Sequence, residues 1–214
     1  MIEVLKHWAD ILLHADNSLR TLVADYKGWT YLILILIIFC ETGLVVTPFL
    51  PGDSLLFAAG TVASGLHVLN IYTLVITLFL AAFAGDNSNY FFGRYIGPKV
   101  FSMNFRFIKR DYLVKTHMFY EKHGGQTIII ARFIPIIRTF APFVAGISIM
   151  DYKKFLIYSI AGNILWINLF LWVGYLLGTN KYIEQHFSAV TLIIIAVSLL
   201  PGIYGIIKNR FATK

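Results

Sequence analysis

Charged residues and cysteine are scarce in this sequence. Only 14% of its 214 residues are charged, and its single cysteine, Cys40, lies in an apolar segment. One cysteine excludes an internal disulfide and a thiolate metal cluster. The six histidines are scattered without the paired spacing of a metal site. Motifs of hydrolases, nucleotide-binding loops and zinc helices are missing too. We therefore expect no cofactor, no metal and no enzymatic activity.

Apolar residues dominate instead. They make up 58% of the chain, and the mean hydropathy is +0.72. An average globular protein is roughly half apolar and a quarter charged. The composition therefore predicts an all-α integral membrane protein.

Buried charges of opposite sign occur in two separate stretches. Residues 28–93 contain no lysine or arginine, yet they carry Glu41 and Asp53. A later apolar stretch carries only Arg132 and Arg138 as charged residues. An ionised side chain at membrane depth costs several kcal/mol unless it is paired or faces water. The two stretches are therefore expected to compensate each other.

The first acidic stretch does not resemble a simple transmembrane helix. Pro48, Pro51 and Gly52 interrupt residues 29–66, and the apolar segment at 55–66 has about a dozen residues, where spanning takes ~20. We predict a re-entrant helical hairpin over 29–66 with its tip at the prolines. The alternative is a kinked spanning helix followed by a loop.

A second interrupted segment covers residues 124–150. It contains Pro135, Thr139 and Pro142, where we expect the tip of a second hairpin. The preceding loop, 93–123, carries seven basic and two acidic residues, and the basic sequence DYKK follows the segment. The positive-inside rule places both flanks in the cytoplasm, so the segment enters and leaves on one side.

The rest of the chain follows from length and charge. We expect an amphipathic interfacial helix at 1–28, transmembrane helices at 69–92, 152–177 and 188–207, and a cytoplasmic tail at 208–214.

Short internal echoes indicate a repeat. FAAG at 57–60 resembles FVAG at 143–146, and GRYIG at 93–97 resembles GYLLG at 174–178. Each half then consists of a hairpin followed by a span, with the second half inverted. Inverted repeats with discontinuous helices are typical of transporters.

The four buried charges suit two tasks. Arginine stays protonated and presents a fork that binds phosphate, so Arg132 and Arg138 are candidate phosphate ligands. The alternative is that they only neutralise Glu41 and Asp53. A carboxyl group at low dielectric can take up a proton near neutral pH, so Glu41 and Asp53 are candidate proton carriers. Asp53 has a further alternative, because PGDS is a good helix N-cap sequence.

Asp86 and Asn87 form a possible secondary polar site in the span at 69–92. We interpret Asp86 as a polar contact between helices, with a proton relay as the alternative.

Three motifs together resemble the DedA family of bacterial inner-membrane proteins. They are FCETG at 39–43 with PGDS at 51–54, FYEKHG at 119–124, and ARFIPIIRT at 131–139 followed by AG at 145–146. The resemblance implies a bacterial inner-membrane location and a fold shared with the lipid scramblases of the VTT group, which have two opposed re-entrant hairpins. It also implies return of undecaprenyl phosphate across the membrane, linked to the proton motive force, with Glu41, Asp53, Arg132 and Arg138 as essential residues.

The predicted function is therefore a proton-linked translocase of undecaprenyl phosphate or a similar polyprenyl phosphate. Its partners are the lipid, protons and membrane phospholipids, with no nucleic acid, and the oligomeric state stays open. Two alternatives are a cation or drug/proton antiporter and an energy-independent phospholipid scramblase. A scaffold has no use for four buried charges, and a phosphatase lacks its nucleophile.

Overall fold

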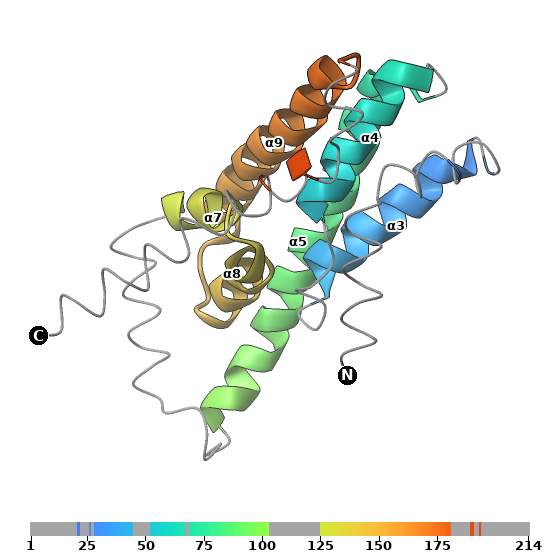
Figure 1. Cartoon of the computed structure of the whole chain (residues 1–214). Helices are drawn as coiled ribbons and strands as arrows, with labels where there is room; N and C mark the ends of the chain where they lie inside the picture. Colours follow the sequence, from blue (N-terminus) through green and yellow to red (C-terminus); the bar gives the residue numbers. More distant parts are fainter. Residues whose placement is uncertain are drawn as a thin grey trace, which may run out of the picture. The chain divides into compact units, whose positions relative to one another are not determined.

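Helices form the described part of the chain (Figure 1). The computed structural model describes residues 28–44, 52–66, 69–102 and 125–180, with Thr21, Tyr26, Ala189, Val190 and Ile193. Within these residues there is no strand. The helices are α3 (Trp29–Gly43), α4 (Gly52–Leu66), α5 (Ile71–Ser102), α7 (Gln126–Ala131), α8 (Pro135–Ile147) and α9 (Tyr152–Leu177).

Several predicted segments lie outside the described residues, apart from isolated positions. These are the N-terminal helix at 1–28, the loop beyond Ser102, the last span at 188–207, the tail at 208–214, and the prolines Pro48 and Pro51.

Within the described residues, two helices are long and apolar enough to cross a membrane. The apolar stretches are Ile71–Gly97 in α5, with 27 residues, and Tyr152–Leu177, with 26. A span needs ~20 residues, so both suffice. They coincide with the spans expected at 69–92 and 152–177. Helix α5 nevertheless continues beyond Phe92, because its glycines at 93 and 97 lie against a neighbouring backbone and do not end the helix.

Polar side chains define where these two helices begin. Asn70 Oδ1 accepts hydrogen bonds from the N–H groups of Tyr72 and Thr73, at 2.9 and 3.2 Å. Asp151 Oδ1 accepts one from the N–H of Lys154 at 3.0 Å. Both are N-caps, which satisfy backbone donors that the first turn leaves open.

In the segment predicted to form the second hairpin, the helix is interrupted at the Pro135 end of the expected tip. Helix α7 ends at Ala131, and α8 starts at Pro135, whose fixed φ suits the first helical position. The prediction that the tip includes Thr139 and Pro142 is wrong, since α8 runs through both. Pro142 removes one intrahelical hydrogen bond without ending this helix. Helix α8 ends at Ile147, and the turn that follows contains Ile149, which has a positive φ of 54°.

The chain divides into two compact units, each described here by itself. The first contains α4, α5 up to Leu78, and α9 from Ile167. In it α4 packs on the end of α9 through glycines. A side chain at Gly60 would collide with the backbone of Leu171 and Tyr175, and one at Gly174 would collide with the carbonyl group of Phe57.

The second unit contains the end of α3 from Ile38, α5 from Phe79, α7, α8, and α9 up to Trp166. In it α8 packs on α5 through glycines as well. A side chain at Gly146 would collide with the backbone of Tyr90 and Arg94, and one at Gly93 would collide with the carbonyl group of Phe143. Each crossing thus brings backbones into close contact where only hydrogen fits.

Candidate functional site: two buried arginine–carboxylate pairs

The second unit buries three of the four charged residues predicted from the sequence. Glu41 lies near the end of α3, Arg132 just after α7, and Arg138 in the first turn of α8. Their exposed fractions are 1%, 4% and 3%. Asp86 of α5 is fully buried. Charges buried to this degree must be paired, because each uncompensated ion costs several kcal/mol.

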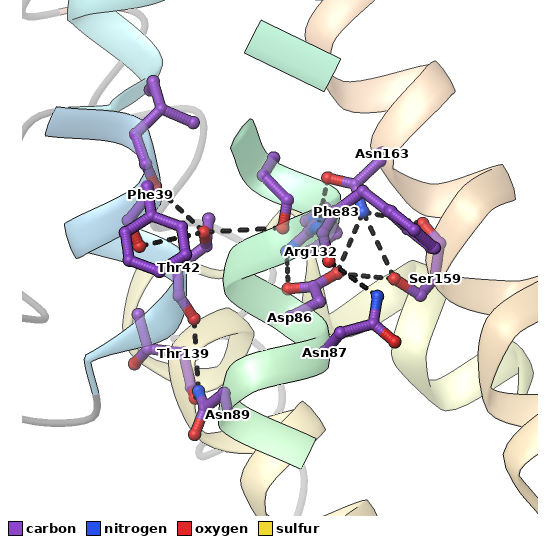
Figure 2. Close-up of polar contacts among 12 residues, drawn as sticks. Phe39, Thr42, Phe83, Asp86, Asn87, Asn89, Arg132, Thr139, Ser159 and Asn163 are labelled. Carbon is purple, nitrogen blue, oxygen red and sulfur yellow. Dashed lines mark hydrogen bonds and ion pairs between the residues drawn. The ribbon is translucent and has the colours of Figure 1, made fainter. Parts of the chain in front are cut away.

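Arg132 is held by a polar network from α5 and α9 (Figure 2). Its guanidinium forms a two-pronged pair with Asp86, with N–O distances of 2.9 and 2.5 Å. The same group also donates to Asn163 Oδ1. Asp86 Oδ2 accepts two further hydrogen bonds, from Ser159 Oγ at 2.6 Å and from Asn163 Nδ2 at 2.9 Å. Bidentate pairs of this kind are strong and fix geometry.

Asp86 therefore makes the contact between helices that the sequence indicated, and it is an ionic one. The expected partner of Arg132 was Glu41 or Asp53, whereas the observed partner is Asp86. Sequence reasoning missed Ser159 and Asn163. Their signal was present, since they are polar residues four positions apart on an otherwise apolar helix, and this spacing places them on one face.

Arg138 pairs with Glu41. Its guanidinium donates to Glu41 Oε1, which joins the end of α3 to the start of α8. The two residues are 97 positions apart in the chain. This pair is the one that the complementary charge pattern of the sequence predicted, although sequence alone left open which carboxylate each arginine takes.

Asn89 of α5 bridges the backbone of Thr42 and Thr139 (Figure 2). Its Nδ2 donates to the carbonyl oxygens of Thr42 at 3.2 Å and Thr139 at 2.6 Å. These residues directly follow Glu41 and Arg138. One fully buried amide therefore fixes the backbone next to each member of the ion pair.

Close approach of α3 and α5 makes this bridge possible. A Cβ at Gly43 would lie only 3.2 Å from the Cα of Gly85. Thr42 Oγ1 donates to Ile38 O within α3 at 2.9 Å and contacts Ala82 O of α5 at 3.5 Å. Small residues at this contact place Glu41 and Asp86 on elements that touch.

The indole ring of Trp166 lies against both arginines. The guanidinium carbon is 5.5 Å from the ring centroid for Arg132 and 4.8 Å for Arg138. Trp166 is completely buried. A cation within about 6 Å of the centroid of an aromatic ring is stabilised by the ring. The Trp166 ring therefore stabilises both guanidinium groups, although it carries no charge that would neutralise them.

The remaining predicted residues lie elsewhere. Asp53 belongs to the first unit, where it is buried in the first turn of α4, a position that suits the helix dipole. Gly52 begins this helix, and Pro135 begins α8. Asn87 bonds outside the Arg132 network, since its amide donates to Phe83 O and accepts from the hydroxyl of Tyr152.

Comparison with known proteins identifies the family of this chain. Residues 50–176 match the VTT domain, and the match includes Asp53, Asp86 and both arginines. The chain is 52% identical over 205 residues to Protein DedA of Escherichia coli K12, covering 95% of this chain and 94% of that protein. The chain belongs to the DedA family.

Two further relatives have lower identity to this chain. An uncharacterized membrane protein of Mycobacterium leprae is 44% identical over 170 residues, covering 79% of this chain and 76% of its own length. Inner membrane protein YqjA of Escherichia coli K12 is 32% identical over 184 residues, covering 83% and 82%. No solved structure matches the chain. These names and the two apolar helices support a location in the bacterial inner membrane.

Proposed function

We propose that this DedA-family protein is a membrane lipid transporter, a proton-linked translocase of undecaprenyl phosphate or a similar polyprenyl phosphate. One observation carries the proposal. Two arginines lie buried in a membrane protein, each paired with a carboxylate from another helix. Such an arrangement is a site where a phosphate group can compete with carboxylates for guanidinium donors.

The two arginines lie at different places relative to their helices. Both nitrogen prongs of Arg132, which follows α7, bind Asp86, which accepts two further hydrogen bonds from other side chains. Arg138 donates to Glu41 Oε1 and lies in the first turn of α8, at a helix start that favours an anion. We therefore assign exchange to the Glu41–Arg138 pair, where protonation of Glu41 weakens its hold on Arg138. Arg132 contributes fixed positive charge next to the phosphate, and Asp53 is the second proton-exchanging carboxylate.

The starts of the short helices add to anion binding in this proposal. Helix N-termini present free N–H groups and a positive dipole end. Arg138 lies in the first turn of α8, so its side chain and this helix start belong to one local structure. A phosphate at Arg138 would therefore benefit from both.

The proposed architecture is two inverted repeats, each a re-entrant hairpin followed by a transmembrane helix, with the C-terminus in the cytoplasm. Helix lengths support it, because α3 and α4 have 15 residues each and α8 has 13. Spanning takes ~20 residues. The glycine contacts also support the repeat, because α4 packs against α9 in the same way as α8 packs against α5.

Transport in liposomes tests the function. Purified protein is reconstituted with fluorescently labelled polyprenyl phosphate, and loss of label from one leaflet is followed with and without a proton gradient. We expect gradient-stimulated movement of the phosphate lipid and none of the neutral polyprenol. Glu41→Gln should move lipid at a rate that no longer depends on pH.

Three outcomes would contradict the proposal. Equal movement of many headgroups without a gradient would favour a scramblase. Proton flux driven by small cations or drugs, without lipid movement, would favour an antiporter. Retained pH dependence in Glu41→Gln would remove Glu41 from the proton-exchanging role.

A further inference from the structure

Trp166 is an uncharged residue whose indole ring contacts both arginines of the site. Its ring is within 4.8 Å of the Arg138 guanidinium and 5.5 Å of that of Arg132. Both arginines also have carboxylate partners, Glu41 and Asp86. Trp166 is therefore a side chain that both ion pairs share.

An aromatic face and a carboxylate support an arginine in different ways. A carboxylate takes up guanidinium N–H donors, so a phosphate must displace it. An aromatic face attracts the cation through the ring quadrupole and leaves the N–H donors at the rim of the guanidinium available. The benefit is larger where water is absent, and both arginines are at most 4% exposed.

We propose that Trp166 is a positioning residue for the phosphate site, which holds the guanidinium groups of Arg132 and Arg138 in place while Arg138 exchanges Glu41 for the phosphate. This inference rests on the proposed function and deepens it. When Glu41 is protonated, the ring still faces Arg138, so the guanidinium stays in its buried position and its donors can take a phosphate. Trp166 thus allows the phosphate to replace Glu41 at Arg138 without itself binding the phosphate.

Phosphate-lipid binding tests this role. The full-length protein in detergent is titrated with a short-chain polyprenyl phosphate, with the corresponding polyprenol as a neutral control. We expect Trp166→Leu to weaken phosphate-lipid binding roughly tenfold. Trp166→Phe, which keeps a smaller aromatic face, should fall between Trp166→Leu and the wild type. Binding of the neutral polyprenol should not change.

Trp172→Phe is the matched control. Trp172 lies on the same helix, and its indole N–H donates to Asn168 at 3.1 Å, outside the arginine site. The Trp172→Phe variant should bind the polyprenyl phosphate as tightly as the wild type does. Equal binding by wild type, Trp166→Phe and Trp166→Leu would overturn the inference while leaving the proposed function intact.

A second measurement does not need a ligand. Thermal unfolding is compared for Trp166→Phe, Arg138→Met and the double variant. Residues in contact give non-additive effects, so Trp166→Phe should cost less in the Arg138→Met background than in the wild type. Additive effects would overturn the inference even if lipid binds. Failure of the wild type to bind the phosphate lipid would instead overturn the proposed function, and the unfolding cycle would still decide whether Trp166 supports Arg138.

Discussion

The crossing of α4 with α9 and the crossing of α8 with α5 are both built from glycines packed against a backbone, but their surroundings differ in polarity. In the first unit Gly60 faces the backbone of Leu171 and Tyr175. In the second Gly146 faces that of Tyr90 and Arg94. The sequence spacing is the same in both crossings, since Gly60 follows Phe57 by three positions and Gly146 follows Phe143 by three positions.

The surroundings differ in polarity. The first crossing includes the hydroxyl of Thr61, whose Oγ1 lies within hydrogen-bond distance of two carbonyl oxygens, Phe57 O of its own helix at 3.0 Å and Gly174 O of α9 at 3.3 Å. The second belongs to the unit that buries Glu41, Asp86, Arg132 and Arg138. The comparison teaches that close backbone packing is common to both crossings, whereas the two arginine–carboxylate pairs belong to the second unit.

Removing the charge of Asp86 should have the largest effect on stability. Asp86→Asn leaves Arg132 buried without its anionic partner, which costs about 3–5 kcal/mol of unfolding free energy. Thermal and chemical unfolding in detergent measure the loss. The control is Asn87→Leu, because Asn87 lies next in the chain but bonds outside the network. A loss for Asp86→Asn no larger than for the control would show that the Arg132 network is not a main support of the second unit.

Alanine at the two crossing glycines tests whether the crossings are equivalent. Gly60→Ala and Gly146→Ala each place a Cβ against the backbone of the facing helix. We expect each to destabilise the protein by about 1–3 kcal/mol, the usual cost of overpacking. The two losses should be similar.

The control for this pair is Gly65→Ala on α4, where a Cβ would meet nothing within 4 Å. It should be neutral, or stabilising by about 0.5–1 kcal/mol, because alanine is the better helix former. A large loss at only one crossing would break the proposed equivalence.

Thr61→Val should have the smallest effect and sharpens the difference between the crossings. The change keeps the shape and removes the hydroxyl donor to Gly174 O, for an expected loss of about 0.5–1.5 kcal/mol. Ile147 follows Gly146 as Thr61 follows Gly60, and it has no hydroxyl. A loss well above this range, seen in thermal unfolding, would mean that the hydroxyl is essential to the first crossing.

Much of this could be predicted from the sequence. Hydropathy and length gave the two spans, since apolar runs of sufficient length are visible without tertiary information. The echoes of FAAG with FVAG and of the glycine pairs predicted a repeat, and the glycines of these echoes lie at the two crossings, a contact that the sequence did not predict. Scarcity of charge singled out Glu41, Arg132 and Arg138, because an isolated charge in an apolar run requires a partner.

The rest depended on tertiary packing. Which carboxylate joins Arg132 could not be read from charge alone, since Glu41, Asp53 and Asp86 were equally available. The break was predicted too broadly, from Pro135 to Pro142, because either proline could end a helix. A helix tolerates Pro142 in its interior, whereas Pro135 starts α8. Trp166 and Asn89 resembled ordinary core residues until their contacts with the site were known.

The most direct test of the account is binding of polyprenyl phosphate to the purified protein, wild type against Arg138→Ala and Arg132→Ala, with neutral polyprenol as control. The account predicts phosphate-dependent binding that is lost in Arg138→Ala and strongly reduced in Arg132→Ala, in variants that remain folded. Binding that is absent in the wild type, or unchanged in both variants, would contradict it and leave the arginines as counter-ions of Glu41 and Asp86.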